Sequence, residues 1–216
     1  MRFARGLSIP VRAPIVVLGA EAGGILRDLK TSTRWKVSGF SSYTGNARGV
    51  DLNSYEQVMS RINKASAKAG LCMFELYKDP DPKAFVGFAA ELVGTGAPMT
   101  FVDFTAARKG RGLKSCFATP WTGVPKLSSE VASIIESADF RIVDTSDESH
   151  VFAPLIAQGW ARWKNAYNEA SSITDLAIRA EYLQTLSRYA HLWAERLDAL
   201  RAGQLQVTRF QTRRKG

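Results

Sequence analysis

Residues 99–114, MTFVDFTAARKGRGLK, decide how the rest of this 216-residue chain can fold. The run from Met99 to Phe104 is apolar and strand-forming, and it carries a single acid, Asp103. A loop follows in which two glycines let the backbone approach a ligand closely. This loop concentrates four cations within seven residues: Arg108, Lys109, Arg111 and Lys114. The stretch therefore predicts a strand that opens into a phosphate-binding loop.

The segments on either side of this stretch alternate between strand and helix patterns. Residues 71–77 and 140–143 have the composition of strands. A helix is predicted from Asp81-Pro82 to Gly94, and Ser128 or Ser129 is predicted to be the N-cap of a second helix. Strands that alternate with helices are typical of parallel sheets. We therefore predict an α/β fold, with a mixed, largely parallel sheet and covering helices.

The first 70 residues extend the same pattern. Strands are predicted over 14–18 and 35–40, and a helix runs from the N-cap Asn53 to about Ala69, with Gly70 as its stop. One face of this helix carries three cations: Arg61, Lys64 and Lys68. The Gly-rich segment 19–24 fails as a dinucleotide fingerprint, because Glu21 stands where the backbone must approach a pyrophosphate. A tight turn is the prediction there.

The C-terminal third predicts a helical pair followed by a tail. Helices are expected over 151–170 and 173–202, so we divide the chain into an α/β domain (1–150), a helical hairpin packed on it (151–203) and a basic tail (204–216). The tail carries Arg213 and Arg214. The second helix has an apolar seam from Leu183 to Leu200, with residues spaced alternately three and four apart. That seam packs on the body of the protein or forms a homodimer.

The charge of the chain favours a polyanionic partner. The net charge is +9, and the excess of cations lies in residues 1–50, in residues 151–216 and in the loop at 108–114. Since no sequence-specific DNA- or RNA-binding motif is present, we predict non-specific binding to nucleic-acid phosphates. No apolar run is long enough to span a bilayer, and the two cysteines form no metal or disulfide pattern. A cytoplasmic protein is expected, with a targeting segment at the Arg-rich N-terminus as the alternative.

Two acids mark a candidate catalytic site. In a parallel sheet, Asp103 and Asp144 would both lie at the carboxyl edge, where ligands of α/β sheets bind. Paired carboxylates beside phosphate-binding cations suit Mg²⁺-assisted phosphoryl transfer. If the protein is an enzyme, we therefore expect a nuclease or nucleotide hydrolase. The alternative is that each acid pairs with a neighbouring arginine and that the basic loop is merely solvated.

The run FVDFTAARKGRGLKSCFATPWTG, residues 101–123, resembles the fertility-inhibition proteins of conjugative plasmids. The resemblance implies a ParB/sulfiredoxin-like fold, with activity on nucleotides or DNA. It favours a DNA-binding accessory protein of a plasmid or phage that interferes with DNA transfer. Two alternatives stay open: the Mg²⁺-dependent hydrolase, and a protein-interaction or virion-assembly module that works through the C-terminal helices.

Overall fold

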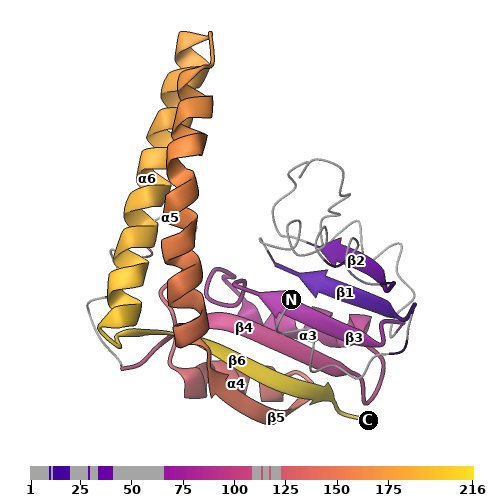
Figure 1. The fold of residues 1–216 in the computed structure, drawn as a ribbon. Coiled ribbons are helices and arrows are strands. Elements are labelled where there is room, and N and C mark those ends of the chain that lie inside the picture. The colour runs from indigo at the N-terminus through magenta and orange to yellow at the C-terminus, as the bar shows by residue number, and fades with distance from the viewer. Residues whose placement is uncertain are drawn as a thin grey trace.

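A computed structural model describes residues 10, 12–19, 29, 34–40, 66–108, 113, 117 and 123–216. Within these residues the chain forms one six-stranded sheet and four helices (Figure 1). The strands are β1 (Pro14–Leu18), β2 (Lys36–Phe40), β3 (Ala69–Met73), β4 (Pro98–Ala106), β5 (Phe140–Asp147) and β6 (Leu205–Arg214). The helices are α3 (Pro82–Leu92), α4 (Ser128–Ser137), α5 (Ser149–Ser171) and α6 (Leu176–Arg201).

The sheet has the strand order β2-β1-β3-β4-β6-β5. The first four strands in this order are mutually parallel, whereas β6 runs antiparallel to both β4 and β5. As a result β5 runs in the same direction as β4, although β6 lies between them. The α/β class with a largely parallel sheet is confirmed. The carboxyl ends of β1, β2, β3 and β4 share one edge, which we call the carboxyl edge, and their starts form the amino edge.

Alternating side chains of the sheet build a core on each face. Phe101 of β4 and Phe210 of β6 pack with α3 and α4 on one face. Val102 and Phe104 of β4 pack on the other face with the base of α5 and α6, where Leu200 is buried. Because both faces of β4 are covered, its eight residues from Met99 onward are all buried.

Capping side chains explain where the helices begin. Asp81 accepts a hydrogen bond from the Ala84 N–H at 3.0 Å, and Pro82 follows in the first turn, as predicted for α3. The predicted serine cap of α4 is wrong, because the N-cap residue stands one position before Ser128 and its side chain makes no capping hydrogen bond. There Leu127 is the N-cap residue, and its N–H donates to the Glu130 carboxylate at 2.9 Å.

The hairpin of α5 and α6 rises from the sheet as two long helices lying side by side (Figure 1). Only its base joins the core: Leu197 and Leu200 of the apolar seam are buried there, whereas Leu183 and Leu186 farther up are half-buried. The seam thus contributes to packing inside the chain, and its use between two copies stays a prediction. No helix among the described residues is long and apolar enough to cross a membrane.

Two predicted boundaries are wrong. Residues 53–65 of the helix expected over 53–69 lie outside the described residues, but its proposed end, Ala69 and Gly70, begins β3 instead. A Cβ on Gly70 would lie 2.1 Å from the Met99 sulfur, so this glycine permits close strand packing rather than ending a helix. The expected basic tail is the strand β6, which pairs with β4 from Ala106 to Pro98.

Candidate functional site

The segment Met73–Tyr77, which we call the β3 turn, stands at the centre of the carboxyl edge. Phe74 leaves the strand with a φ of 56°, a left-handed conformation that is rare for a bulky residue. Its N–H still donates to the Val102 carbonyl of β4 at 2.8 Å. The Glu75 carbonyl then accepts from the N–H groups of Lys78 and Asp79, at 2.9 and 3.0 Å. All five residues of the β3 turn are buried, so the chain turns sharply inside the molecule.

Two glycines let other segments approach the β3 turn. Gly19, directly after β1, has a φ of +110°, and a Cβ there would lie 2.4 Å from the Met73 carbonyl oxygen. A Cβ on Gly123 would lie 2.5 Å from the Tyr77 carbonyl oxygen. Both positions require glycine, because any side chain would collide with backbone that cannot move aside. The β3 turn is therefore held closely from both of its ends.

Asp103 binds the middle of the β3 turn from β4. Its carboxylate accepts the Leu76 N–H at 2.6 Å and the Phe104 N–H at 2.8 Å, and its side chain is 1 % exposed. Burial raises the pKa of this carboxyl from 3.8 to about 7, although the two N–H groups act in the opposite direction. A buried acid near neutrality at a ligand edge marks a candidate functional position.

Aromatic rings close the edge on the side of the hairpin. Phe104 contacts Phe74, Tyr77 and Phe117, with ring centroids 4.7–5.5 Å apart. Arg196 of α6 is 6 % exposed, and its guanidinium lies 4.7 Å from the ring centroids of both Phe117 and Trp193. These contacts favour a water-poor environment in which charge is stabilised by aromatic faces.

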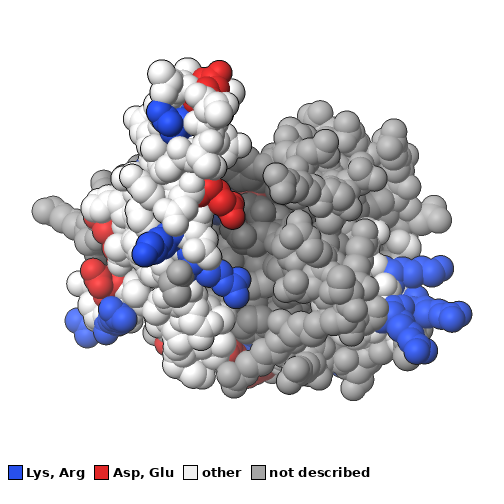
Figure 2. Space-filling model, turned by 45° about the horizontal axis from the view of Figure 1, so that its top comes forward, with Lys and Arg blue, Asp and Glu red and all other residues white. Residues whose placement is uncertain are grey.

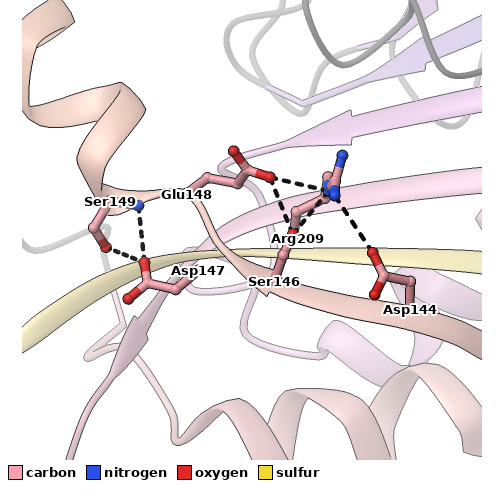
Figure 3. A network of polar contacts seen from close by, with 6 residues as sticks. All are labelled: Asp144, Ser146, Asp147, Glu148, Ser149 and Arg209. Carbon is pink, nitrogen blue, oxygen red and sulfur yellow. Dashed lines mark hydrogen bonds and ion pairs between the residues drawn. The ribbon is translucent and has the colours of Figure 1, made fainter.

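A second polar network anchors the start of α5 (Figure 3). Arg209 of β6 forms ion pairs with Glu148 at 3.2 Å and with Asp144 at 3.4 Å, and its Nε donates to the Ser146 hydroxyl at 3.0 Å. The Glu148 side chain is only 8 % exposed, whereas that of Asp144 is 50 % exposed. Arg209 therefore stabilises the junction between β5 and α5, which is the base of the hairpin.

The structure does not bring Asp103 and Asp144 together. The register of β6 places Asp103 opposite Thr208 but Asp144 opposite Gln211, with β6 between the two acids. Strand alternation also directs them to opposite faces. Because β5 continues to Asp147, Asp144 lies within the strand rather than at its carboxyl end. A shared metal between these two residues does not fit this geometry, and the described residues contain no metal-binding group of three or more ligands.

The predicted phosphate-binding cations are dispersed. Arg108 is exposed two residues after β4, at the carboxyl edge. Arg213 and Arg214 lie in β6, and their guanidinium groups donate to the carbonyls of Gly96 and Val93. They thus stabilise the end of α3 and the loop that follows it. The remaining predicted cations, apart from Lys68, lie outside the described residues: Arg61, Lys64, Lys109, Arg111 and Lys114.

Lys68 belongs to a different group, at the amino edge. Its backbone N–H donates to the Pro14 carbonyl at 2.8 Å, which places it beside the start of β1. Lys36 lies opposite Pro14 on the other side of β1, and Arg12 and Arg34 precede the two strands. All four are exposed, and Lys and Arg side chains gather at this end of the molecule, on the right in Figure 2.

Reasoning from the sequence missed the β3 turn, which it treated as part of a strand. Two signals were available: Glu75 interrupts an otherwise apolar run, and Gly19 directly follows the apolar strand 14–18. The closeness of Gly123 to Tyr77 had no local signal, because these residues are far apart in the sequence.

Neither a protein-family model nor a curated protein sequence matches this chain. Solved structures do match. The cyclopropane synthase MmaA2 from Mycobacterium tuberculosis superposes with a TM-score of 0.73 at 12% identity, over 96% of this chain and 80% of that one. Geranyl diphosphate C-methyltransferase from Streptomyces coelicolor A3(2), in complex with S-adenosyl-L-homocysteine, gives 0.66 at 13% identity, over 99% and 77%. The [4+2]-cyclase SpnF gives 0.71 at 10% identity, over 98% and 78%.

These matches overturn the predicted identity. The chain has the α/β fold of these proteins over nearly its whole length, and not a ParB/sulfiredoxin-like fold. The predictions of a DNA-binding fertility-inhibition protein of a plasmid, of a Mg²⁺-dependent nuclease and of a virion module are wrong. The run that carried the resemblance begins as a central, fully buried strand. The supposed basic tail is an internal strand, in which Arg213 and Arg214 donate to backbone carbonyls. The chain is therefore similar in fold to methyltransferases and cyclopropane synthases.

Proposed function

We propose that this protein binds S-adenosyl-L-methionine (SAM) at the carboxyl edge of β1, β3 and β4 and transfers its methyl group to an acceptor molecule. The observation that carries the proposal is the sheet itself. Five of its strands run in one direction, and the antiparallel strand β6 lies between β4 and the edge strand β5. The fold superposes along almost the entire chain on a C-methyltransferase and a cyclopropane synthase. In such sheets, ligands bind outside the carboxyl ends of the strands.

The described residues of this edge fit a ligand of this kind. The turn at Gly19 packs directly against the β3 turn, so the segments that follow two neighbouring parallel strands meet at the edge where such sheets bind ligands. SAM carries its methyl group on a positively charged sulfonium, which becomes neutral on transfer. The buried acids Glu75 and Asp103 supply negative charge at this edge, and the rings of Phe104 and Tyr77 reduce access of water.

Calorimetry with the purified full-length chain tests the proposal directly. We expect SAM and S-adenosyl-L-homocysteine to bind with dissociation constants roughly in the micromolar to sub-millimolar range, and NAD and ATP to bind much more weakly. NAD and ATP are the informative competitors, because α/β sheets also bind these ligands at the same edge. Preferential binding of either one would contradict the proposal.

Transfer is tested separately from binding. The protein is incubated with SAM carrying a labelled methyl group and with the small-molecule, lipid and macromolecular fractions of a cell extract. We expect label to enter one fraction with the wild-type protein and not with Gly19→Ala, in which the turn after β1 collides with Met73. Equal labelling by both proteins would contradict a site at this edge.

A further inference from the structure

Asp103 makes a cross-link that the strand ladder cannot make. It belongs to β4, yet its carboxylate reaches the β3 turn and accepts the Leu76 N–H at 2.6 Å. By this point β3 has ended, at Met73, and its register with β4 ends at Val102. The Leu76 N–H therefore has no partner in the strand ladder. Since Leu76 is only 2 % exposed, water has little access to this N–H either. The Asp103 carboxylate supplies the hydrogen-bond acceptor that the strand ladder no longer provides where the chain leaves the sheet.

The position of the β3 turn controls the segments around it. The Met73 carbonyl lies against Gly19, and the Tyr77 carbonyl lies against Gly123, both without room for a Cβ. A shift of the β3 turn by a few tenths of an ångström would therefore displace the chain after β1. Phe74, in its left-handed conformation, does not stabilise this geometry by itself, because such a conformation costs free energy in a bulky residue.

We propose that Asp103 is a positioning residue: its ionised carboxylate holds the β3 turn, and through it the Gly19 turn, in the geometry that SAM binding requires. This inference rests on the proposed function. It differs from a catalytic role, since the Asp103 carboxylate is directed to two backbone N–H groups inside the molecule rather than to a reacting atom. When the carboxyl is protonated, one oxygen becomes a hydroxyl and a weaker acceptor, which loosens the β3 turn.

The charges around Asp103 place this change near neutral pH. Burial raises the pKa of Asp103, and Glu75 acts in the same direction, whereas the two N–H groups and Lys78 lower it; the result is a pKa of about 7. Cys72 of β3 is buried beside these groups, and burial together with Asp103 and Glu75 raises the pKa of its thiol, so Cys72 stays neutral. On the other side, β6 places the uncharged Thr208 opposite Asp103. The charge of Asp103 therefore changes around pH 7.

The test is the pH dependence of ligand affinity, measured by calorimetry with S-adenosyl-L-homocysteine from pH 6 to pH 8. If only the ionised form binds well, the wild-type affinity falls about tenfold from pH 8 to pH 6, because the ionised fraction falls by that factor. Asp103→Asn keeps one carbonyl acceptor but cannot ionise. We expect it to bind more weakly than the wild type at pH 8 and to show a flat profile. Asp144→Asn, the matched control on β5, keeps the wild-type profile.

The outcomes separate this inference from the proposed function. Absence of ligand binding at every pH overturns both. Binding with a flat wild-type profile, or with the same slope in Asp103→Asn, overturns the positioning role alone. Nuclear magnetic resonance checks the geometry without any ligand: the Leu76 and Phe104 amide signals of the wild type should titrate near pH 7 and should not titrate in Asp103→Asn. If they stay constant in the wild type, the inference is wrong even where the affinities agree with it.

Discussion

The two edges of the sheet differ in how they treat charge and backbone geometry. The carboxyl edge buries Glu75 and Asp103 and holds Phe74 at a positive φ. The amino edge leaves Arg12, Arg34, Lys36 and Lys68 in solvent. Buried charge and left-handed bulky residues both oppose folding, whereas exposed cations cost little. The carboxyl edge therefore contains features that oppose folding, as a site built for binding would, whereas the amino edge does not.

The largest effect is expected at Gly19 of the carboxyl edge, and Gly96 of the amino edge supplies the control. Gly19→Ala places a Cβ 2.4 Å from the Met73 carbonyl at a φ of +110°, so we expect a loss of about 4 kcal/mol of unfolding free energy and no SAM binding. Gly96, before β4, also has a positive φ, of +72°, but its Cβ would meet nothing within 4 Å. Gly96→Ala should cost only about 1 kcal/mol and leave binding intact. Denaturant unfolding and calorimetry check both, and equal losses would remove the contrast between the edges.

The pH dependence of stability tests the cost of burying Asp103. Its pKa is about 7 in the folded protein and near 3.8 when unfolded, so the folded state binds the proton more tightly. The stability that the folded state gains from its tighter proton binding at Asp103 is complete below about pH 4, and it is lost as the pH rises through 7. At about 1.4 kcal/mol per pH unit, the wild type should lose about 4 kcal/mol relative to Asp103→Asn across this window.

Urea unfolding of the two proteins from pH 4 to pH 8 measures this difference, and the other titrating groups cancel in the comparison. The exposed Asp139, which has a φ of 63°, supplies the control, because asparagine tolerates this conformation. Asp139→Asn should follow the wild type at every pH. Parallel curves for wild type and Asp103→Asn would show that burial does not shift this carboxyl.

A smaller effect is expected at the junction of β5 and α5. Arg209→Ala leaves the buried Glu148 carboxylate without its opposite charge. We expect the unfolding free energy to fall by about 2 kcal/mol, because water reaches Glu148 too little to replace the lost arginine. Asp144→Asn removes only the exposed half of the network and should cost less than about 0.5 kcal/mol. Thermal unfolding ranks the two variants, and a reversed ranking would contradict the stabilisation of this junction by the ion pair of Arg209 with Glu148.

The smallest effect is expected at the amino edge. Replacing Arg12, Arg34, Lys36 and Lys68 together by glutamine should change the unfolding free energy by less than about 0.5 kcal/mol per residue, since the structure shows them exposed. SAM affinity should stay within about twofold of the wild type, because these residues lie at the opposite edge of the sheet from Asp103. A large loss of affinity would show that the two edges are coupled.

Local patterns predicted the architecture where neighbouring residues determine it. Asp81 and Pro82 mark the start of α3 by a side-chain hydrogen bond and a preset backbone angle, both readable from adjacent residues. The same holds for the apolar run of β4 and for the long helices of the hairpin. By contrast, the segment over 205–214 looked like a tail because its pattern is mixed with arginine, although Val207 and Thr208 favour a strand.

By itself, the sequence determined the α/β class and the parallel direction of β3, β4 and β5, because these follow from local propensity and from the order of elements. Only the tertiary structure decided that β6 enters between β4 and β5, that Asp144 lies away from Asp103 and that Asp103 holds the β3 turn. Each of these depends on pairing between distant residues, such as Asp103 with Thr208. Strand register and close backbone contacts come from packing of the whole molecule, which no local pattern encodes.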